Sequence, residues 1–254
     1  MLKIMTMNLN YYVEKHGPWS SRKKILVEEI GKESPDIIAL QAVRSDPGVE
    51  GGLNQAGQIA ELFPQYSHVF FQPVETAEDG SSEGCALLST VALARLDVFP
   101  LSYLPGTDDP YHRVLLHARI DRPGSPLHLF NAHFSWVPLQ AAQNVAEFSG
   151  FAQVFNGDKL LVGDLNNQPD SEALLNLQVG GWIDLWQKFC HDQPGYTFQT
   201  EENGLRIDYM LANESLAEKA ESIRIIADET VSDPSGTGSP MRASDHSGLV
   251  AVFR

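Results

Sequence analysis

The sequence predicts an α/β fold in which two β-sheets pack face to face and helices cover their outer sides. Strand-like apolar runs alternate with segments whose apolar residues recur at helical spacing. In the middle of the chain three β-rich runs, CALLSTVAL, VLLHARID and LHLFNAHF, follow one another with little helix between them. A doubly wound order, with a helix after nearly every strand, is the competing arrangement, and these consecutive strands disfavour it.

Each element follows from a local pattern, taken in chain order. The run LKIMTMNL at 2–9 is strand-like, and serines precede the helical spacing of Ile25, Leu26 and Ile30. Besides the three central runs, strands are expected at 2–9, 36–41, 66–74, 159–164, 206–212 and 247–254. Helices are expected at 20–34, 54–63 and 138–155.

Length and composition limit the class of protein. The chain has 254 residues, 43% hydrophobic and 20% charged, which is typical of a globular protein and favours one domain over residues 1–254. Cys85 and Cys190 are too few for a disulfide framework, and no run approaches the ~20 apolar residues that span a bilayer. Because the N-terminus turns polar by residue 8, it lacks the apolar core of a signal peptide. We therefore expect a soluble, cytoplasmic protein and a monomer.

The net charge restricts the classes of substrate. It is −15, from 18 Lys+Arg against 33 Asp+Glu. Proteins that hold nucleic acid through nonspecific phosphate contacts usually carry a basic face. The balance disfavours long duplex DNA as the main substrate, although a bound metal ion can supply positive charge locally.

Several predicted strands end in polar residues, at the edge where sheets place their ligand-binding groups. Asn8, Gln41, His133 and Asp164 with Asn166 lie at such strand ends, Asp208 lies inside the strand 206–212, and Asp245 with His246 stands just before the last strand. Taken singly, each fits a turn-forming or structural residue better than a catalyst. The last pair shares this edge if the final strand runs antiparallel to its neighbour.

The strings around these residues are specific when they are taken together. TMNLN, IIALQAVR, EGCALLS, NAHFS, VGDLNN, RIDYML and SDHSGL occur in the order of the motifs of the endonuclease/exonuclease/phosphatase superfamily, which the chain resembles from Asn8 to His246. That superfamily includes exonuclease III-like nucleases, deoxyribonuclease I, neutral sphingomyelinases, inositol phosphate phosphatases and deadenylases. The resemblance implies a four-layer αββα sandwich of two mixed β-sheets flanked by helices, and a metal-dependent phosphoesterase.

The resemblance also implies catalytic roles that suit phosphodiester hydrolysis. Asp164 would orient and deprotonate the attacking water, and Asn166 would help to hold the water and the phosphate. His246 would donate to a nonbridging phosphate oxygen, while Asp208 fixes its tautomer and orientation. His133 would be a second donor to the phosphate.

The metal-binding part of the site departs from the family. Asn8 and Asp245 match positions of direct or water-mediated contacts to Mg²⁺, for which Mn²⁺ is a possible substitute. The glutamate of the family's LQE motif binds the metal directly, but here LQAVR has Ala42 in its place. Alanine cannot ligate a cation, so the chain as it stands is expected to be nearly inactive. Because the other motif residues are present, an introduced Glu→Ala substitution explains this isolated departure better than the alternative, a natural pseudoenzyme.

Four further residues are candidate contacts to the substrate. Arg113 matches a family position where an arginine often precedes this strand, and Trp136 follows NAHFS, from which it could stack on a base or sugar. Tyr196 and Phe198 lie in a segment that lines the site in several relatives.

The main hypothesis is therefore hydrolysis of a phosphodiester in nucleic acid or a nucleotide, with single-stranded nucleic acid as a candidate partner. A phospholipid or inositol-phosphate substrate is the alternative within the hydrolases. A non-catalytic protein that uses the old phosphate cleft to bind a ligand or partner is the alternative from another class.

Overall fold

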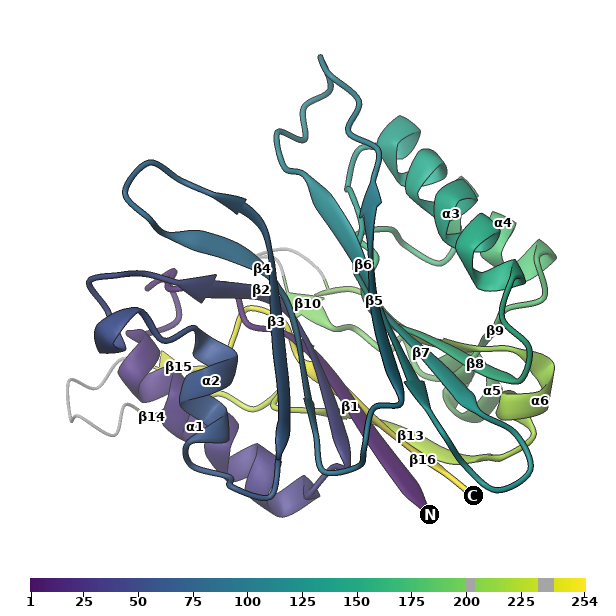
Figure 1. The fold of residues 1–254 in the computed structure, drawn as a ribbon, viewed down its shortest axis with the longest axis horizontal. Helices are drawn as coiled ribbons and strands as arrows, with labels where there is room; N and C mark the ends of the chain where they lie inside the picture. The colour runs from purple at the N-terminus through teal and green to yellow at the C-terminus, as the bar shows by residue number, and fades with distance from the viewer. Residues whose placement is uncertain (200–203, 233–239) are drawn as a thin grey trace.

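The computed structural model describes residues 1–199, 204–232 and 240–254. It confirms the predicted α/β sandwich: two mixed six-stranded sheets face each other, with helices on their outer sides (Figure 1). The doubly wound alternative is wrong, because each sheet contains both parallel and antiparallel neighbours. Within the described ranges, no helix is long and apolar enough to cross a bilayer.

The first sheet has the order β13-β16-β1-β2-β4-β3. Its strands are β1 (Leu2–Asn8), β2 (Ile37–Ser45), β3 (His68–Thr76), β4 (Ser82–Ser89), β13 (Ala220–Ile226) and β16 (Gly248–Phe253). β1 runs parallel to β2 and antiparallel to β16. The residues just before β16 therefore lie at the same edge as Asn8, as the sequence predicted for Asp245 and His246, and the two chain termini lie together at the opposite end (Figure 1).

The second sheet has the order β5-β6-β7-β8-β12-β9. Its strands are β5 (Arg95–Leu101), β6 (Arg113–Ile120), β7 (Leu127–His133), β8 (Asp158–Asp164), β9 (Ile183–Asp184) and β12 (Asp208–Ala212). The register pairs Asp164 with His133 on one side and with Asp208 on the other. Two short ribbons are β10 (Phe198–Gln199) with β11 (Gly204–Leu205), and β14 (Val231–Ser232) with β15 (Pro240–Met241).

Helices cover both outer faces (Figure 1). The first sheet is covered by α1 (Trp19–Glu33), α2 (Gln55–Ala60) and a 3₁₀ turn (Glu50–Gly52). The second sheet is covered by α3 (Pro138–Gln153) and α4 (Glu172–Val179). Two further helices, α5 (Leu185–Cys190) and α6 (Glu214–Ala217), are short. Alternate residues of β1 face different cores, because successive side chains of a strand point to opposite faces. Ile4 packs between the sheets, whereas Met5 packs under α1 against Leu26 and Ile30, at the helical spacing that predicted α1.

Several elements were not predicted. The sequence patterns of β5, β13, α4 and α5 were too short or too mixed in polarity to predict a strand or a helix. β5 contains a proline and begins with an exposed arginine, and α4 and α5 have only eight and six residues. β5 is an edge strand, where proline is tolerated because one side of the strand needs no ladder hydrogen bond. These additions complete the two sheets without changing the predicted architecture.

A buried polar bridge joins the two sheets below the edge that carries the site. The Gln41 side chain on β2 donates to Asn131 Oδ1 on β7 at 2.7 Å. Asn131 in turn donates to the carbonyls of Leu40 at 3.1 Å and Ala86 at 3.0 Å. Because buried amides need hydrogen-bond partners, this bridge restrains how one sheet can slide over the other. The strand predicted to end at Gln41 continues to Ser45, and Gln41 lies inside β2 with a structural role.

Candidate active site

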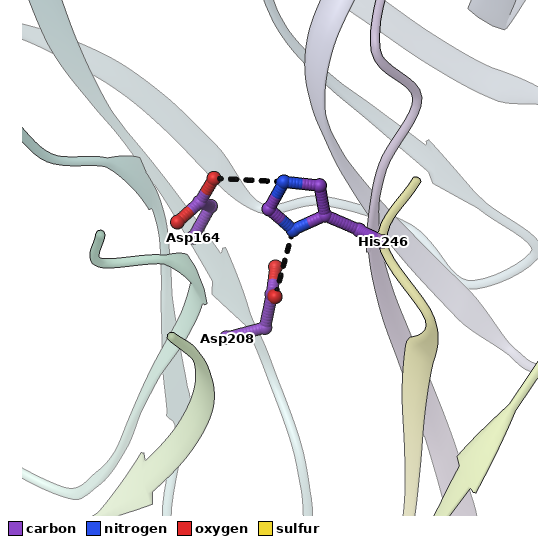
Figure 2. A group of neighbouring side chains, drawn as sticks. All are labelled: Asp164, Asp208 and His246. Carbon is purple, nitrogen blue, oxygen red and sulfur yellow. Dashed lines mark hydrogen bonds and ion pairs between the residues drawn. The ribbon is translucent and has the colours of Figure 1, made fainter. Parts of the chain in front are cut away.

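Asp164, the last residue of β8, is the centre of the site. Its Oδ2 accepts a hydrogen bond from Asn8 Nδ2 of the opposite sheet at 2.8 Å. The Nε2 atoms of His133 and His246 lie 3.4 Å and 3.7 Å from the same oxygen. The parallel register with β7 and the approach of β16 thus bring together residues far apart in the sequence, as Figure 2 shows for Asp164 and His246.

The backbone around Asp164 is shaped by tight local contacts. Asn166 has a positive φ of 53°, its backbone N–H donates to Asp164 Oδ1 at 2.8 Å, and its side chain donates to the carbonyl of Phe134 at 2.9 Å. Gly163 has a φ of 130°, and a Cβ there would lie 2.0 Å from the carbonyl oxygen of Ala132. The glycine before Asp164 is therefore required by the close approach of β7, beyond ordinary turn formation.

His246 and Asp208 form a buried pair. His246 Nδ1 lies 2.9 Å from Asp208 Oδ2, which leaves Nε2 directed toward Asp164 (Figure 2). Burial alone would lower the pKa of His246, but the charges of Asp208 and Asp164 overcome it and raise the pKa to about 10. His246 is therefore a cationic donor at neutral pH. The Thr197 hydroxyl accepts from the backbone N–H of Asp208 at 3.1 Å and holds this strand end in place.

Asp164 and His133 are shifted in ways that suit acid–base work. Burial and the charge of Asp208 raise the pKa of Asp164 to about 6, against the opposing influence of His246 and Asn8. Burial and the cationic Arg113 lower the pKa of His133 well below its usual value. At neutral pH His133 is a neutral imidazole, while Asp164 is a carboxylate poised to take up a proton.

Ala42, at the position where the family resemblance implies a glutamate, has a left-handed backbone conformation. Ala42 is 2% exposed and has a φ of 50°, at an irregularity in the pairing of β2 with β4. Its carbonyl accepts from Tyr11 N at 2.9 Å. A left-handed conformation costs a residue with a Cβ about 1 kcal/mol or more, and such strain concentrates at functional sites.

The donor atoms present fit a divalent cation. Asp164 and Asp208 offer carboxylate oxygens within 4.8 Å of each other and of a ring nitrogen of His246, which is protonated at neutral pH and therefore donates rather than ligates. Asp208 Oδ1 is buried and has no hydrogen-bond partner among the residues that the structure describes. Such an oxygen suits a hard cation such as Mg²⁺ or Mn²⁺. Position 42 adds no ligand, so the oxygen donors are one carboxylate fewer than the family resemblance implies.

The candidate contacts to the substrate form two groups, one beside His133 and one beside His246. Arg113 is 5% exposed and lines a hollow with His133; its Nη2 is 2.8 Å from Asp109 Oδ2, and its guanidinium lies 5.3 Å from the centre of the Trp136 ring. Phe198 packs on His246 with ring centres 4.9 Å apart.

Tyr196, beside Phe198 in the chain, is 48% exposed. Asp245 lies next to His246 in the chain, and its charge helps to raise the pKa of that histidine.

Three residues with a part in the site were not predicted. Arg22 of α1 is fully buried and donates to the carbonyls of Leu9 at 2.8 Å, Tyr11 at 2.6 Å and Ala243 at 3.1 Å. Glu83 lines the hollow beside Arg113 and opens the string EGCALLS, a signal that was available in the sequence. For Arg22 and Asp109 the sequence contained no comparable signal.

Comparison with known proteins agrees with this geometry. The sequence model of the Endonuclease/Exonuclease/phosphatase family matches residues 5–246. The chain is similar in structure to an endonuclease/exonuclease/phosphatase family protein from Leptotrichia buccalis C-1013-b, at 18% identity over 100% of both chains with a TM-score of 0.78. It is similar to the Bacteroides thetaiotaomicron VPI-5482 mannosyl-6-phosphatase at 15% identity over 100% of both chains, with a TM-score of 0.79.

The chain is also similar to D. rerio TDP2 complexed with single strand DNA product, at 17% identity over 100% of this chain and 98% of that chain, with a TM-score of 0.72. At these identities the likeness to solved structures concerns the fold alone. The chain matches no curated protein in sequence.

Proposed function

The chain belongs to the endonuclease/exonuclease/phosphatase family of phosphoester hydrolases, and we propose that its parent enzyme is a Mg²⁺-dependent phosphodiesterase. The observation that carries this proposal is the single oxygen, Asp164 Oδ2, that faces Asn8, His133 and His246 together. A carboxylate flanked by one neutral and one cationic imidazole supplies a proton acceptor and two donors close together. We treat residues 1–254 as one domain, since the core between the sheets draws on both halves of the chain.

In the proposed mechanism, a water molecule attacks the phosphorus atom and Asp164 accepts its proton. A pKa near 6 keeps Asp164 ionised at neutral pH while leaving it basic enough for this transfer. His246 donates from Nε2 to a nonbridging oxygen, because Asp208 occupies Nδ1. His133 is the second donor, and Asn166 holds the water and the phosphate. The P–O bond to the leaving group breaks as the new P–O bond forms, and the leaving oxygen takes up a proton from water to depart as an alcohol.

Asn8, Asp245 and the unpartnered Asp208 Oδ1 are the groups that would hold the cation. When bound, Mg²⁺ supplies charge neutralisation on the phosphate oxygens. Because Ala42 stands where the family has its glutamate ligand, we propose that this chain binds Mg²⁺ weakly and is nearly inactive. We attribute Ala42 to an introduced Glu→Ala substitution, and a native gene that encodes alanine at this position would contradict that part.

The proposed substrate is a phosphodiester of nucleic acid or a nucleotide. The exposed aromatic side chains of Trp136 and Tyr196 support it, because bases stack on such rings. The net charge of −15 argues against long duplex DNA. A phospholipid or inositol-phosphate ester is the alternative. TDP2 with its single strand DNA product and the mannosyl-6-phosphatase have this fold, so the fold does not choose between substrates.

The test compares hydrolysis by the chain with Ala42 and by the Ala42→Glu form. The substrates are single-stranded DNA, duplex DNA, RNA, bis-p-nitrophenyl phosphate and sphingomyelin, each with Mg²⁺ or with EDTA. We expect Mg²⁺-dependent activity only in the Glu form, with the preferred substrate identifying the branch of the family.

Two control variants make the result specific. Ala92→Glu adds a carboxylate at an exposed position outside the site and should gain no activity. Asp164→Asn in the Glu form should abolish what Ala42→Glu restores. If the Glu form binds phosphate esters but cleaves none of them, the fold serves binding and the hydrolase proposal is wrong.

A further inference from the structure

Two half-exposed aromatic side chains stand together at the edge of the hollow that contains His133. Tyr111 is 42% exposed and Trp136 is 43% exposed. Their ring centres are 5.9 Å apart with an interplanar angle of 67°, so they form two walls of a corner. The other tryptophans of the chain are at most 8% exposed. Leaving two large rings accessible beside a reaction centre costs hydrophobic burial, which a bound apolar ring would recover.

A buried arginine fixes this corner to the phosphate side of the site. The Arg113 guanidinium lies 5.7 Å from the centre of the Tyr111 ring and 5.3 Å from that of Trp136. Its Nη2 is bonded to Asp109, which is 1% exposed, while its Nε is buried without a partner among the described residues. Tyr111, Arg113 and His133 line the same hollow. A ring placed in the corner is therefore adjacent to a phosphate held by His133.

Beyond the corner the surface becomes acidic. A second hollow shares Tyr111 and Glu83 with the first, and its other charged residues are Glu75, Asp79 and Arg44. Three carboxylates against one guanidinium repel additional phosphates, and Arg44 is already bonded to Ser81 through Nη2 at 2.9 Å. A polynucleotide that continued in this direction would lack the cations that usually follow its backbone.

We infer that Tyr111 and Trp136 form a binding site for the base of a nucleotide with a single phosphate group, and that the acidic hollow beyond them excludes a longer polynucleotide. Arg113 stands at the junction of base and phosphate. This inference rests on the proposed function, and it narrows the substrate from nucleic acid or nucleotide to a compound of nucleotide size.

The experiment measures binding to the chain as it stands, by isothermal titration calorimetry, so that slow turnover does not interfere. The probes are AMP, adenosine, ribose 5-phosphate and an eight-residue oligodeoxyadenylate. Base–aromatic stacking contributes ~1–3 kcal/mol per base, so AMP should bind about 10- to 100-fold more tightly than ribose 5-phosphate. AMP should also quench the tryptophan fluorescence, because Trp136 is the one exposed tryptophan.

Variants separate stacking from a general effect on the fold. Trp136→Ala and Tyr111→Ala should lower the affinity for AMP to near that for ribose 5-phosphate, whose own affinity should not change. Trp136→Phe, which keeps a ring, should retain most of the difference. Phe189→Ala removes a ring of 36% exposure on α5 and should leave binding of AMP unchanged.

The outcomes are distinguishable. Equal affinity for AMP and ribose 5-phosphate, or AMP binding that does not depend on Trp136, overturns the inference and leaves the proposed function intact. An oligonucleotide that binds much more tightly than AMP overturns the limit to one phosphate. If adenosine binds in a Trp136-dependent way and AMP binds no more tightly, the base site stands and the proposed phosphoesterase function fails.

Discussion

Arg22 allows a quantitative test of how the site is held. Its guanidinium is fully buried and donates to three carbonyls: those of Leu9 and Tyr11, in the segment that follows Asn8, and that of Ala243, in the segment that leads to Asp245. Burial lowers the pKa of Arg22 to about 10, because it destabilises the charged form. The hydrogen bonds to the three carbonyls offset this cost. We expect Arg22→Met to destabilise the chain and to loosen both segments.

The magnitude follows from the contacts. The carbonyls of Leu9 and Ala243 are left without partners at ~2 kcal/mol each, and the Tyr11 carbonyl, which keeps its bond from Gln55, loses ~1 kcal/mol, or roughly 5 kcal/mol together. Removing a buried charge whose pKa stands about 2.5 units below its ordinary value returns roughly 3 kcal/mol, at 1.36 kcal/mol per unit. The net loss for Arg22→Met is therefore about 2 kcal/mol. Arg22→Lys keeps the charge, but a single ammonium group cannot bond to the carbonyls of both segments. About half of the loss of stability is therefore expected.

The assay is urea denaturation followed by circular dichroism, with the free energy of unfolding extrapolated to water. Arg119→Met is the matched control, because that arginine is 45% exposed and pairs with a still more exposed Asp121, so its loss should cost below about 1 kcal/mol. In the Ala42→Glu form, Arg22→Met should also weaken Mg²⁺ binding, measured by calorimetry on folded protein. If Arg22→Met costs no more stability than Arg119→Met, the hydrogen bonds from Arg22 to the three carbonyls do not hold these segments.

Two further substitutions test the strand ends. Asp208→Asn removes the carboxylate that contributes most to raising the pKa of His246 to about 10. A histidine with a raised pKa stabilises the fold fully below its unfolded pKa of 6.5. It loses that contribution as the pH rises to about 10. The stability deficit of Asp208→Asn, about 2 kcal/mol, should therefore be largest near pH 6 and shrink toward pH 10 in urea titrations; a deficit independent of pH would contradict the charge assignment. Gly163→Ala places a Cβ 2.0 Å from the carbonyl oxygen of Ala132 at a φ of 130° and should cost about 3 kcal/mol or more by the same assay. Gly150→Ala in α3, where nothing lies within 4 Å, should instead stabilise by about 0.5–1 kcal/mol, and similar effects at both glycines would refute the steric argument.

The sequence alone predicted several strands and helices and the order of the motifs. Hydrophobic periodicity predicted β1, α1, β7, α3 and β8, because a run that is buried on both faces, or at 3.6-residue spacing, has few other ways to satisfy its apolar side chains. The predicted strands also supplied much of the candidate site: His133 ends β7, Asp164 ends β8 and Asp208 begins β12, and the three are neighbours because these strands pair in this register. The absence of a carboxylate at position 42 was also evident from the sequence alone.

Contacts between distant segments depended on the folded chain. Asn8 reaches Asp164 from the other sheet across 156 positions of sequence, and Arg22 reaches the carbonyl of Ala243 across 221, so no local pattern could reveal either bond. The same holds for Tyr111, which meets Trp136 only because β6 and β7 lie side by side. A sequence specifies which side chains can do chemistry, since residue type and strand position are local properties. Their distances, burial and pKa values arise from packing, because each depends on every segment that surrounds the group.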